Sequence, residues 1–107
     1  MPTKPLDSPT IKQLRQIAHH LDPVVSVGDQ GISESVIAET KRALKDHELI
    51  KVKIHSEDRQ DRKLMGSQLA EACQADVIQT IGKITVLFRR NPQPNPRLSN
   101  LSRLGGR

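Results

Sequence analysis

The spacing of apolar residues along the chain predicts three helices. Within residues 9–21, apolar side chains recur every three or four positions, which indicates an amphipathic helix with one buried face. We expect Ser8 to cap this helix and Pro9 to take its first position, where the missing N–H of proline costs little. A second helix is predicted over 34–48, after a Ser33 cap. A third is predicted over 59–75, after an Asp58 cap.

Between these helices, shorter segments follow a pattern of period two. The β-branched run "PVVSV" (23–27) predicts a strand, and "LIKVKIHS" (49–56) alternates apolar with polar residues. In the second segment Ile50, Val52 and Ile54 would point to a core, and the lysines between them to the opposite face. Residues 76–90 read as a hairpin that turns near Gly82-Lys83.

The resulting order α-β-α-β-α-β-β predicts the fold class: an α/β domain, single and compact, with two layers. The two β-α-β units predict right-handed crossovers and parallel strands, and the closing hairpin predicts an antiparallel pair. The sheet is therefore expected to be four-stranded and mixed, and we expect helices to cover mainly one of its faces.

Charge divides the chain unevenly. Residues 1–88 carry as many acidic as basic side chains, so the net charge of +5 falls on residues 89–107, which contain no acid. A basic segment of this kind favours a polyanion such as RNA or DNA, although a solubilising tail has the same composition. We divide the chain into an N-terminal arm (1–8), one domain (9–90) and a basic, proline-containing tail (91–107) that is expected to be extended or disordered.

The segment Gly28-Asp29-Gln30-Gly31 follows the first predicted strand and precedes a helix. Loops at the carboxyl ends of parallel strands share one edge of a sheet, and ligands of open α/β sheets bind there. A glycine pair at this position suits close approach of a phosphate to backbone N–H groups. Two glycines also suit a simple tight turn with positive φ angles, and Asp29 places a carboxylate in the loop. Both interpretations remain open from the residues alone.

Basic residues are expected to surround this loop. We expect the start of the first helix, the start of the third helix and the hairpin turn to bring cations to the same edge. The candidate RNA-binding residues are Gly28, Asp29, Gln30, Gly31, Lys12, Arg15, Arg59, Lys63 and Lys83.

Two longer segments identify a family. "LDPVVSVGDQGISESVIAETKRALKDHELIKVKI", followed by "VIQTIGKITVLFRR", closely resembles the bacterial YhbY-type proteins, which are stand-alone CRM domains. The resemblance covers roughly residues 9–90. It implies a fold similar to the C-terminal domain of bacterial translation initiation factor three. The resemblance also implies that the protein binds RNA through the G-x-x-G loop. It further implies association with precursors of the large ribosomal subunit and a relation to plant proteins that assist group II intron splicing.

The residues give little indication of metal binding, catalysis or base stacking on aromatic side chains. The histidines lack metal-ligand spacing, and Cys73 lies on the apolar side of a predicted helix, so we expect neither a metal, a cofactor, a small-molecule substrate nor catalysis. A single aromatic residue, Phe88, argues against domains that stack bases on aromatic platforms. Without a long apolar segment, we expect no membrane span and a cytoplasmic location. The alternative is a protein-interaction module that uses the tail or the sheet face carrying Lys51 and Lys53.

Overall fold

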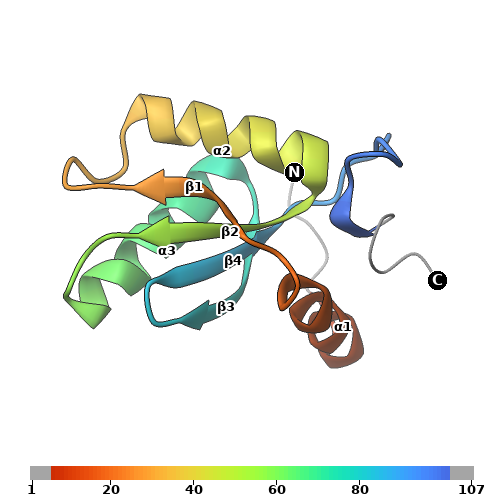
Figure 1. Cartoon of the computed structure of the whole chain (residues 1–107), viewed down its shortest axis with the longest axis horizontal. Coiled ribbons are helices and arrows are strands. Elements are labelled where there is room, and N and C mark those ends of the chain that lie inside the picture. Colours follow the sequence, from red (N-terminus) through yellow and green to blue (C-terminus); the bar gives the residue numbers. More distant parts are fainter. Residues whose placement is uncertain (1–5, 102–107) are drawn as a thin grey trace.

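The computed structural model describes residues 6–101 and contains the elements in the predicted order (Figure 1). This confirms the expected α/β domain with three helices and a four-stranded mixed sheet. The elements are α1 (Ser8–Ala18), β1 (Pro23–Val27), α2 (Glu34–His47), β2 (Leu49–Ile54), α3 (Arg59–Cys73), β3 (Asp76–Ile81) and β4 (Ile84–Phe88).

The strands lie in the order β1-β2-β4-β3. Strands β1 and β2 are parallel, while β4 is antiparallel to both β2 and β3. Strand β3 therefore runs in the same direction as β1 and β2, as predicted. The loops that follow these three strands consequently meet at one edge of the sheet, which we call the loop edge: residues 28–31, residues 55–58 and the turn at 82–83.

Helices α2 and α3 cover one face of the sheet. Their apolar residues pack with Val25, Val27, Ile50, Val52 and Ile54 in one core cluster, so the alternation predicted for β2 holds. The N-cap of α2 is Ser33, whose hydroxyl accepts a hydrogen bond from the backbone N–H of Val36 at 3.2 Å. Asp58 caps α3, also as predicted.

Helix α1 packs against the other face of the sheet. Leu14 and Ile17 join a second core cluster with Leu49, which opens β2, and Phe88, which ends β4. These two strand residues are paired at the end of the sheet away from the loop edge, and Figure 1 shows α1 at that end. The expectation that helices cover mainly one face therefore holds for α2 and α3 but not for α1.

The cap of α1 lies one residue earlier than predicted. Asp7 has an extended backbone, and its carboxylate accepts a hydrogen bond from the N–H of Thr10 at 2.9 Å. Ser8 is consequently the first helical residue and Pro9 the second. Asp and Ser are about equally good caps, so side-chain preference alone could not separate the two positions. The Thr10 side chain, and next its backbone N–H, lower the pKa of the Asp7 carboxyl.

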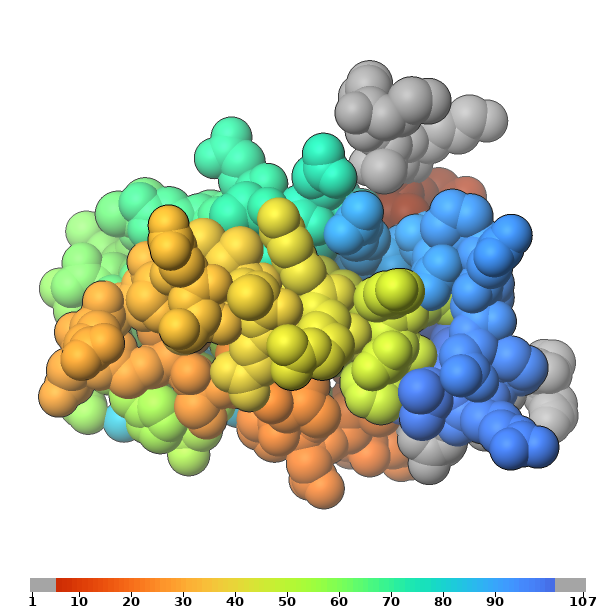
Figure 2. Space-filling model, turned by 90° about the horizontal axis from the view of Figure 1, so that it is seen from above, coloured from red at the N-terminus to blue at the C-terminus, as the bar shows by residue number. Residues whose placement is uncertain are grey.

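Residues 91–101 differ from the expected disordered tail, because they fold back on the end of α2 (Figure 2). Glu48 is buried between α2 and β2, and its carboxylate accepts hydrogen bonds from the Asn91 N–H and the Ser99 hydroxyl, both at 2.7 Å. Asn100 donates its side-chain amide to the carbonyl of Leu49 at 2.6 Å. The remaining tail residues, 102–107, lie outside the described part of the chain.

Gly66 lets α3 approach the sheet closely. A Cβ at this position would lie 3.1 Å from Thr85 Oγ1 and 3.2 Å from Thr85 Cγ2. Thr85 is buried in β4 and, as a β-branched residue, has a restricted χ1, so it cannot move aside freely. We expect Gly66→Ala to lower stability by up to about 1 kcal/mol, although alanine is the better helix former.

The matched background for this test is Thr85→Ala, which removes both crowding atoms. In that background Gly66→Ala should raise stability by about 1 kcal/mol, because only the helix propensity remains. Urea unfolding of the four proteins measures the coupling. An equal effect of Gly66→Ala in both backgrounds would show that the contact with Thr85 is not the reason for the glycine.

Candidate functional site

The Gly28–Gly31 turn at the loop edge is open to solvent. The N–H of Gly31 donates to the carbonyl of Gly28 at 3.0 Å, and Gly31 has a φ of +73°. Gly31 therefore has a conformational reason to be glycine. The backbone of Gly28 does not require glycine, since its φ lies outside the left-handed region. A Cβ at position 28 would also meet no atom within 4 Å. The space above Gly28 is free for the close approach of another molecule.

Backbone hydrogen bonds hold the three loops of the loop edge together. The N–H of His55 donates to the carbonyl of Val27 at 2.9 Å, which joins the end of β1 to the segment after β2. The N–H of Ile54 donates to the carbonyl of Lys83 at 2.7 Å, which joins β2 to the hairpin turn. The loops therefore form one connected surface at the edge of the sheet.

Three cations from the start of α3 gather at this edge. Arg59, Arg62 and Lys63 line a cavity of about 310 Å³ together with Thr80 and Gly82. The structure therefore confirms the predicted position of Arg59 and Lys63, which lie at the same edge of the sheet as the hairpin turn. Sequence reasoning left Arg62 off the candidate residues, although its spacing from Arg59 puts both on one side of a helix.

Arg62 has a structural role as well as a charge. Its Nε donates to the carbonyl of Gly82 at 2.9 Å, and its Nη1 donates to the carbonyl of Ser56 at 2.7 Å. One guanidinium thus connects α3 to the loop after β2 and to the hairpin turn. This fork of donors fixes the geometry in which the neighbouring Arg59 and Lys63 are presented.

Lys83 lies at the loop edge as predicted, but a carboxylate already contacts it. Its Nζ is 3.0 Å from Glu57 Oε2, and this hydrogen bond, with the charge of Lys83, lowers the pKa of the Glu57 carboxyl. Both side chains are exposed, so the pair contributes little to stability. A phosphate at Lys83 would have to compete with Glu57, which makes Lys83 a weaker ligand than Arg59 or Lys63.

Lys12 and Arg15 do not approach the loop edge, and the prediction that they do is wrong. Helix α1 packs on Leu49 and Phe88 at the other end of the sheet (Figure 1). The face that α1 occupies follows from the apolar side chains of β4, whose register against β2 is not apparent from the sequence. These two cations therefore form no common surface with the Gly28–Gly31 turn.

The surroundings of Cys73 and the arrangement of potential metal ligands bear on other chemistry. The Cys73 side chain is buried, and burial raises the pKa of its thiol. Over residues 6–101, no group of three or more His, Cys, Asp or Glu side chains is arranged to hold a metal ion. None of the helices in that range is long and apolar enough to cross a membrane.

Comparison with known proteins agrees with the resemblance stated for the sequence. The family model of the CRS1 / YhbY (CRM) domain matches residues 6–89. This range contains the whole sheet, all three helices and the loop edge, and it ends where the 91–101 segment turns back.

Individual relatives match over most of their length. A Pseudomonas aeruginosa protein named "Probable RNA-binding protein" is 47% identical over 95 residues, which cover 89% of this chain and 91% of the relative. A Haemophilus influenzae protein named "RNA-binding protein" is 42% identical over 85 residues, covering 79% of this chain and 86% of the relative. The solution structure of a Staphylococcus aureus protein, described as a candidate RNA-binding protein, matches with a TM-score of 0.75 at 31% identity. That match covers 83% of this chain and 93% of the other.

Proposed function

Since the chain belongs to the CRS1 / YhbY (CRM) domain family, we propose that it binds RNA and that the loop edge contacts the sugar-phosphate backbone. The observation that carries the proposal is the open turn at Gly28, at the same edge of the sheet as the cavity lined by Arg59, Arg62 and Lys63. Free space over a backbone turn, with several cations along the same edge, is suited to phosphate groups. The names of the relatives support the same class of ligand.

The contacts divide into two kinds. Gly28 lets a phosphodiester come close to the turn, where Asp29 and Gln30 are exposed. Arg59 and Lys63 neutralise phosphates at the neighbouring cavity. Phosphate contacts position an RNA but carry no sequence information, so sequence preference should be weak.

Exchanging the middle pair of the turn tests this proposal. Replacing Asp29 and Gln30 together by lysine raises the net charge at the proposed interface by three, and replacing both by glutamate lowers it by one. We expect the lysine variant to bind a structured ribosomal RNA fragment about tenfold or more tightly at low salt and the glutamate variant to bind more weakly. The lysine variant should also show a steeper dependence on salt. Fluorescence anisotropy over a salt series measures both quantities.

A control on the same fold is Lys12→Ala with Arg15→Ala, which changes charge at the other end of the sheet. This double variant should bind RNA almost as the wild type does. If the two loop variants bind RNA equally well, the Gly28–Gly31 turn is not part of the interface. A wild-type affinity that is indifferent to salt would contradict RNA backbone binding as a whole.

Within this function, we further propose a non-catalytic role in assembly of the large ribosomal subunit. The proposal rests on the resemblance to YhbY-type proteins, for which such an association is expected. The loop variants extend the test: the chain should sediment with large-subunit precursors in sucrose gradients, and the glutamate variant should be depleted from those fractions. Co-sedimentation that survives ribonuclease would instead favour a protein contact, for which the sheet face with the exposed Lys53 is the available surface.

A further inference from the structure

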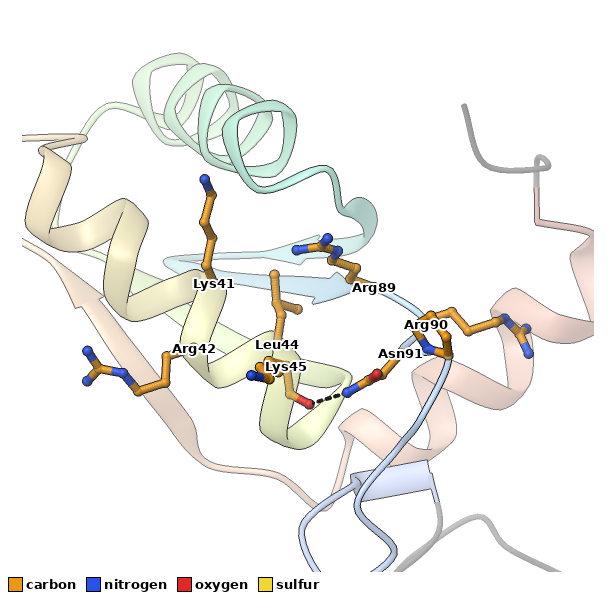
Figure 3. A pocket seen from close by; sticks show the side chains of 8 residues that line it. Lys41, Arg42, Leu44, Lys45, Arg89, Arg90 and Asn91 are labelled. Atoms are coloured by element: carbon orange, nitrogen blue, oxygen red, sulfur yellow. Dashed lines mark hydrogen bonds between the residues drawn. The ribbon is translucent and has the colours of Figure 1, made fainter. Parts of the chain in front are cut away.

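A second cationic pocket lies outside the loop edge. It has a volume of about 450 Å³ and is formed by the second half of α2 and the chain that follows β4 (Figure 3). The lining residues are Lys41, Arg42, Leu44, Lys45, Arg89, Arg90, Asn91 and Pro92.

Positive charge dominates this pocket. Five of its eight lining residues are lysine or arginine, and none is acidic. In the part of the chain that the structure describes, the one ion pair is Lys83 with Glu57, at the loop edge. The Glu48 carboxylate meets the Asn91 N–H, but the lysines and arginines of the pocket have no ion-pair partner among the described residues, so an anion from another molecule would be attracted to them.

The cationic side chains come from α2 and from the segment after β4, and the Leu44 between them is itself fully buried. In Figure 3, Lys41 from α2 and Arg89 from the segment after β4 flank Leu44, while Arg42 and Arg90 extend away from it. Arg90 lies over the ring of Phe88, with its Cζ 5.9 Å from the ring centroid. Lys41 and Arg89 are also close enough to Cys73 to oppose the rise in its pKa. A ligand in the pocket would therefore meet chiefly the charges of Lys41, Lys45 and Arg89.

Hydrogen bonds fix the wall of the pocket. The side-chain amide of Asn91 donates to the carbonyl of Lys45 at 2.7 Å, and the Asn91 N–H donates to the carboxylate of Glu48 at 2.7 Å. These bonds hold the segment after β4 against the end of α2. The pocket is therefore formed before any ligand arrives, which lowers the cost of binding.

We propose that this pocket binds a phosphodiester group of RNA and is a second contact for the RNA that engages the loop edge. The inference rests on the proposed function. The volume falls within the range of about 300–1,000 Å³ typical of small-ligand sites, so the pocket has room for a phosphodiester whose phosphate meets Lys41 and Arg89.

Helix α2 connects the two contacts. It begins at Glu34, directly after the Gly28–Gly31 turn, and Lys41 lies seven residues further along. At about 1.5 Å per residue, Lys41 is about 10 Å along the helix axis from its start. One RNA strand that leaves the loop edge along α2 can therefore reach the pocket without leaving the protein surface.

The double variant Lys41→Ala with Arg89→Ala tests the pocket, and Lys12→Ala with Arg15→Ala is its charge-matched control. The probe is a fluorescein-labelled RNA hairpin with a single-stranded loop. We expect the pocket variant to bind about tenfold more weakly and to reduce the slope of log affinity against log salt by about 1 to 2, one step for each lost phosphate contact. The control should keep the wild-type slope. Thermal melts establish that both variants are folded.

The possible results are distinguishable. Binding by the pocket variant that equals the control, while the Asp29/Gln30 variants still alter affinity, overturns the second contact and leaves the loop edge intact. Wild-type binding without salt dependence defeats the proposed function itself. If the pocket variant keeps RNA affinity but loses binding to poly-glutamate, the pocket takes an acidic protein segment, and the inference is wrong.

Discussion

Glu48→Ala is expected to lower the free energy of unfolding by about 3 kcal/mol and to release residues 91–101 from the domain. The Glu48 side chain is 4% exposed, and its two carboxylate oxygens accept separate hydrogen bonds, from the Asn91 N–H and from the Ser99 hydroxyl. Hydrogen bonds to a charged group contribute about 1.5–3 kcal/mol each, and a buried donor left without its acceptor adds a further cost. Few single contacts in a domain of this size contribute as much.

The backbone of Glu48 makes the choice of variant important. Its φ is +64°, a conformation that costs an alanine about as much as a glutamate, so Glu48→Ala isolates the loss of the carboxylate. Glu48→Gln keeps the side-chain volume but leaves only one oxygen to accept, so it should cost about half as much. Urea unfolding measures stability, and amide hydrogen exchange of residues 91–101 measures their release.

Ser99→Ala is the control for the first prediction, since it removes one of the two donors. It should cost about 1.5 kcal/mol in the wild type and almost nothing in the Glu48→Ala background. Additive effects of the two substitutions would show that the hydroxyl does not depend on Glu48. Unchanged hydrogen exchange over 91–101 in Glu48→Ala would show that other contacts hold the segment.

The position of Glu48 also explains why the tail was mispredicted. Proline and asparagine dominate residues 91–100, and such a composition normally accompanies disorder. The segment is ordered by a backbone N–H and a hydroxyl that donate to one buried carboxylate, with no apolar repeat that a periodicity search could detect. From the sequence, Glu48 itself reads as an ordinary acid at the end of a helix.

Local sequence patterns were sufficient to predict the helices and strands and the part of the candidate site formed by the loop edge. The two β-α-β units and the hairpin of β3 and β4 predicted the strand directions, and these directions place Gly28, Arg59 and Gly82 at one edge. The position of α1 needed more than local information. It depends on Leu49 pairing with Phe88, a long-range register that brings apolar residues of two strands together on the second face.

The role of Arg62 likewise depends on contacts between distant segments. Arg62→Ala should lower the free energy of unfolding by about 2 kcal/mol, because it removes charge-assisted hydrogen bonds to the carbonyls of Gly82 and Ser56. The bond to Gly82 is exposed to solvent, so it contributes less than the bond to Ser56. The variant should also bind RNA more weakly, since it loses a cation and the restraint on the loops beside it. Urea unfolding and anisotropy with a ribosomal RNA fragment measure the two effects.

Two further variants separate the restraint from the charge. Arg62→Lys keeps the charge, but a single ammonium cannot reproduce the planar fork that reaches both carbonyls, so most of the stability should still be lost. Arg59→Ala removes an exposed charge from the same cavity and should weaken RNA binding with little change in stability. If Arg62→Lys retains both the stability and the affinity of the wild type, charge alone accounts for Arg62. The loop edge would then be held in shape by its backbone hydrogen bonds without help from this side chain.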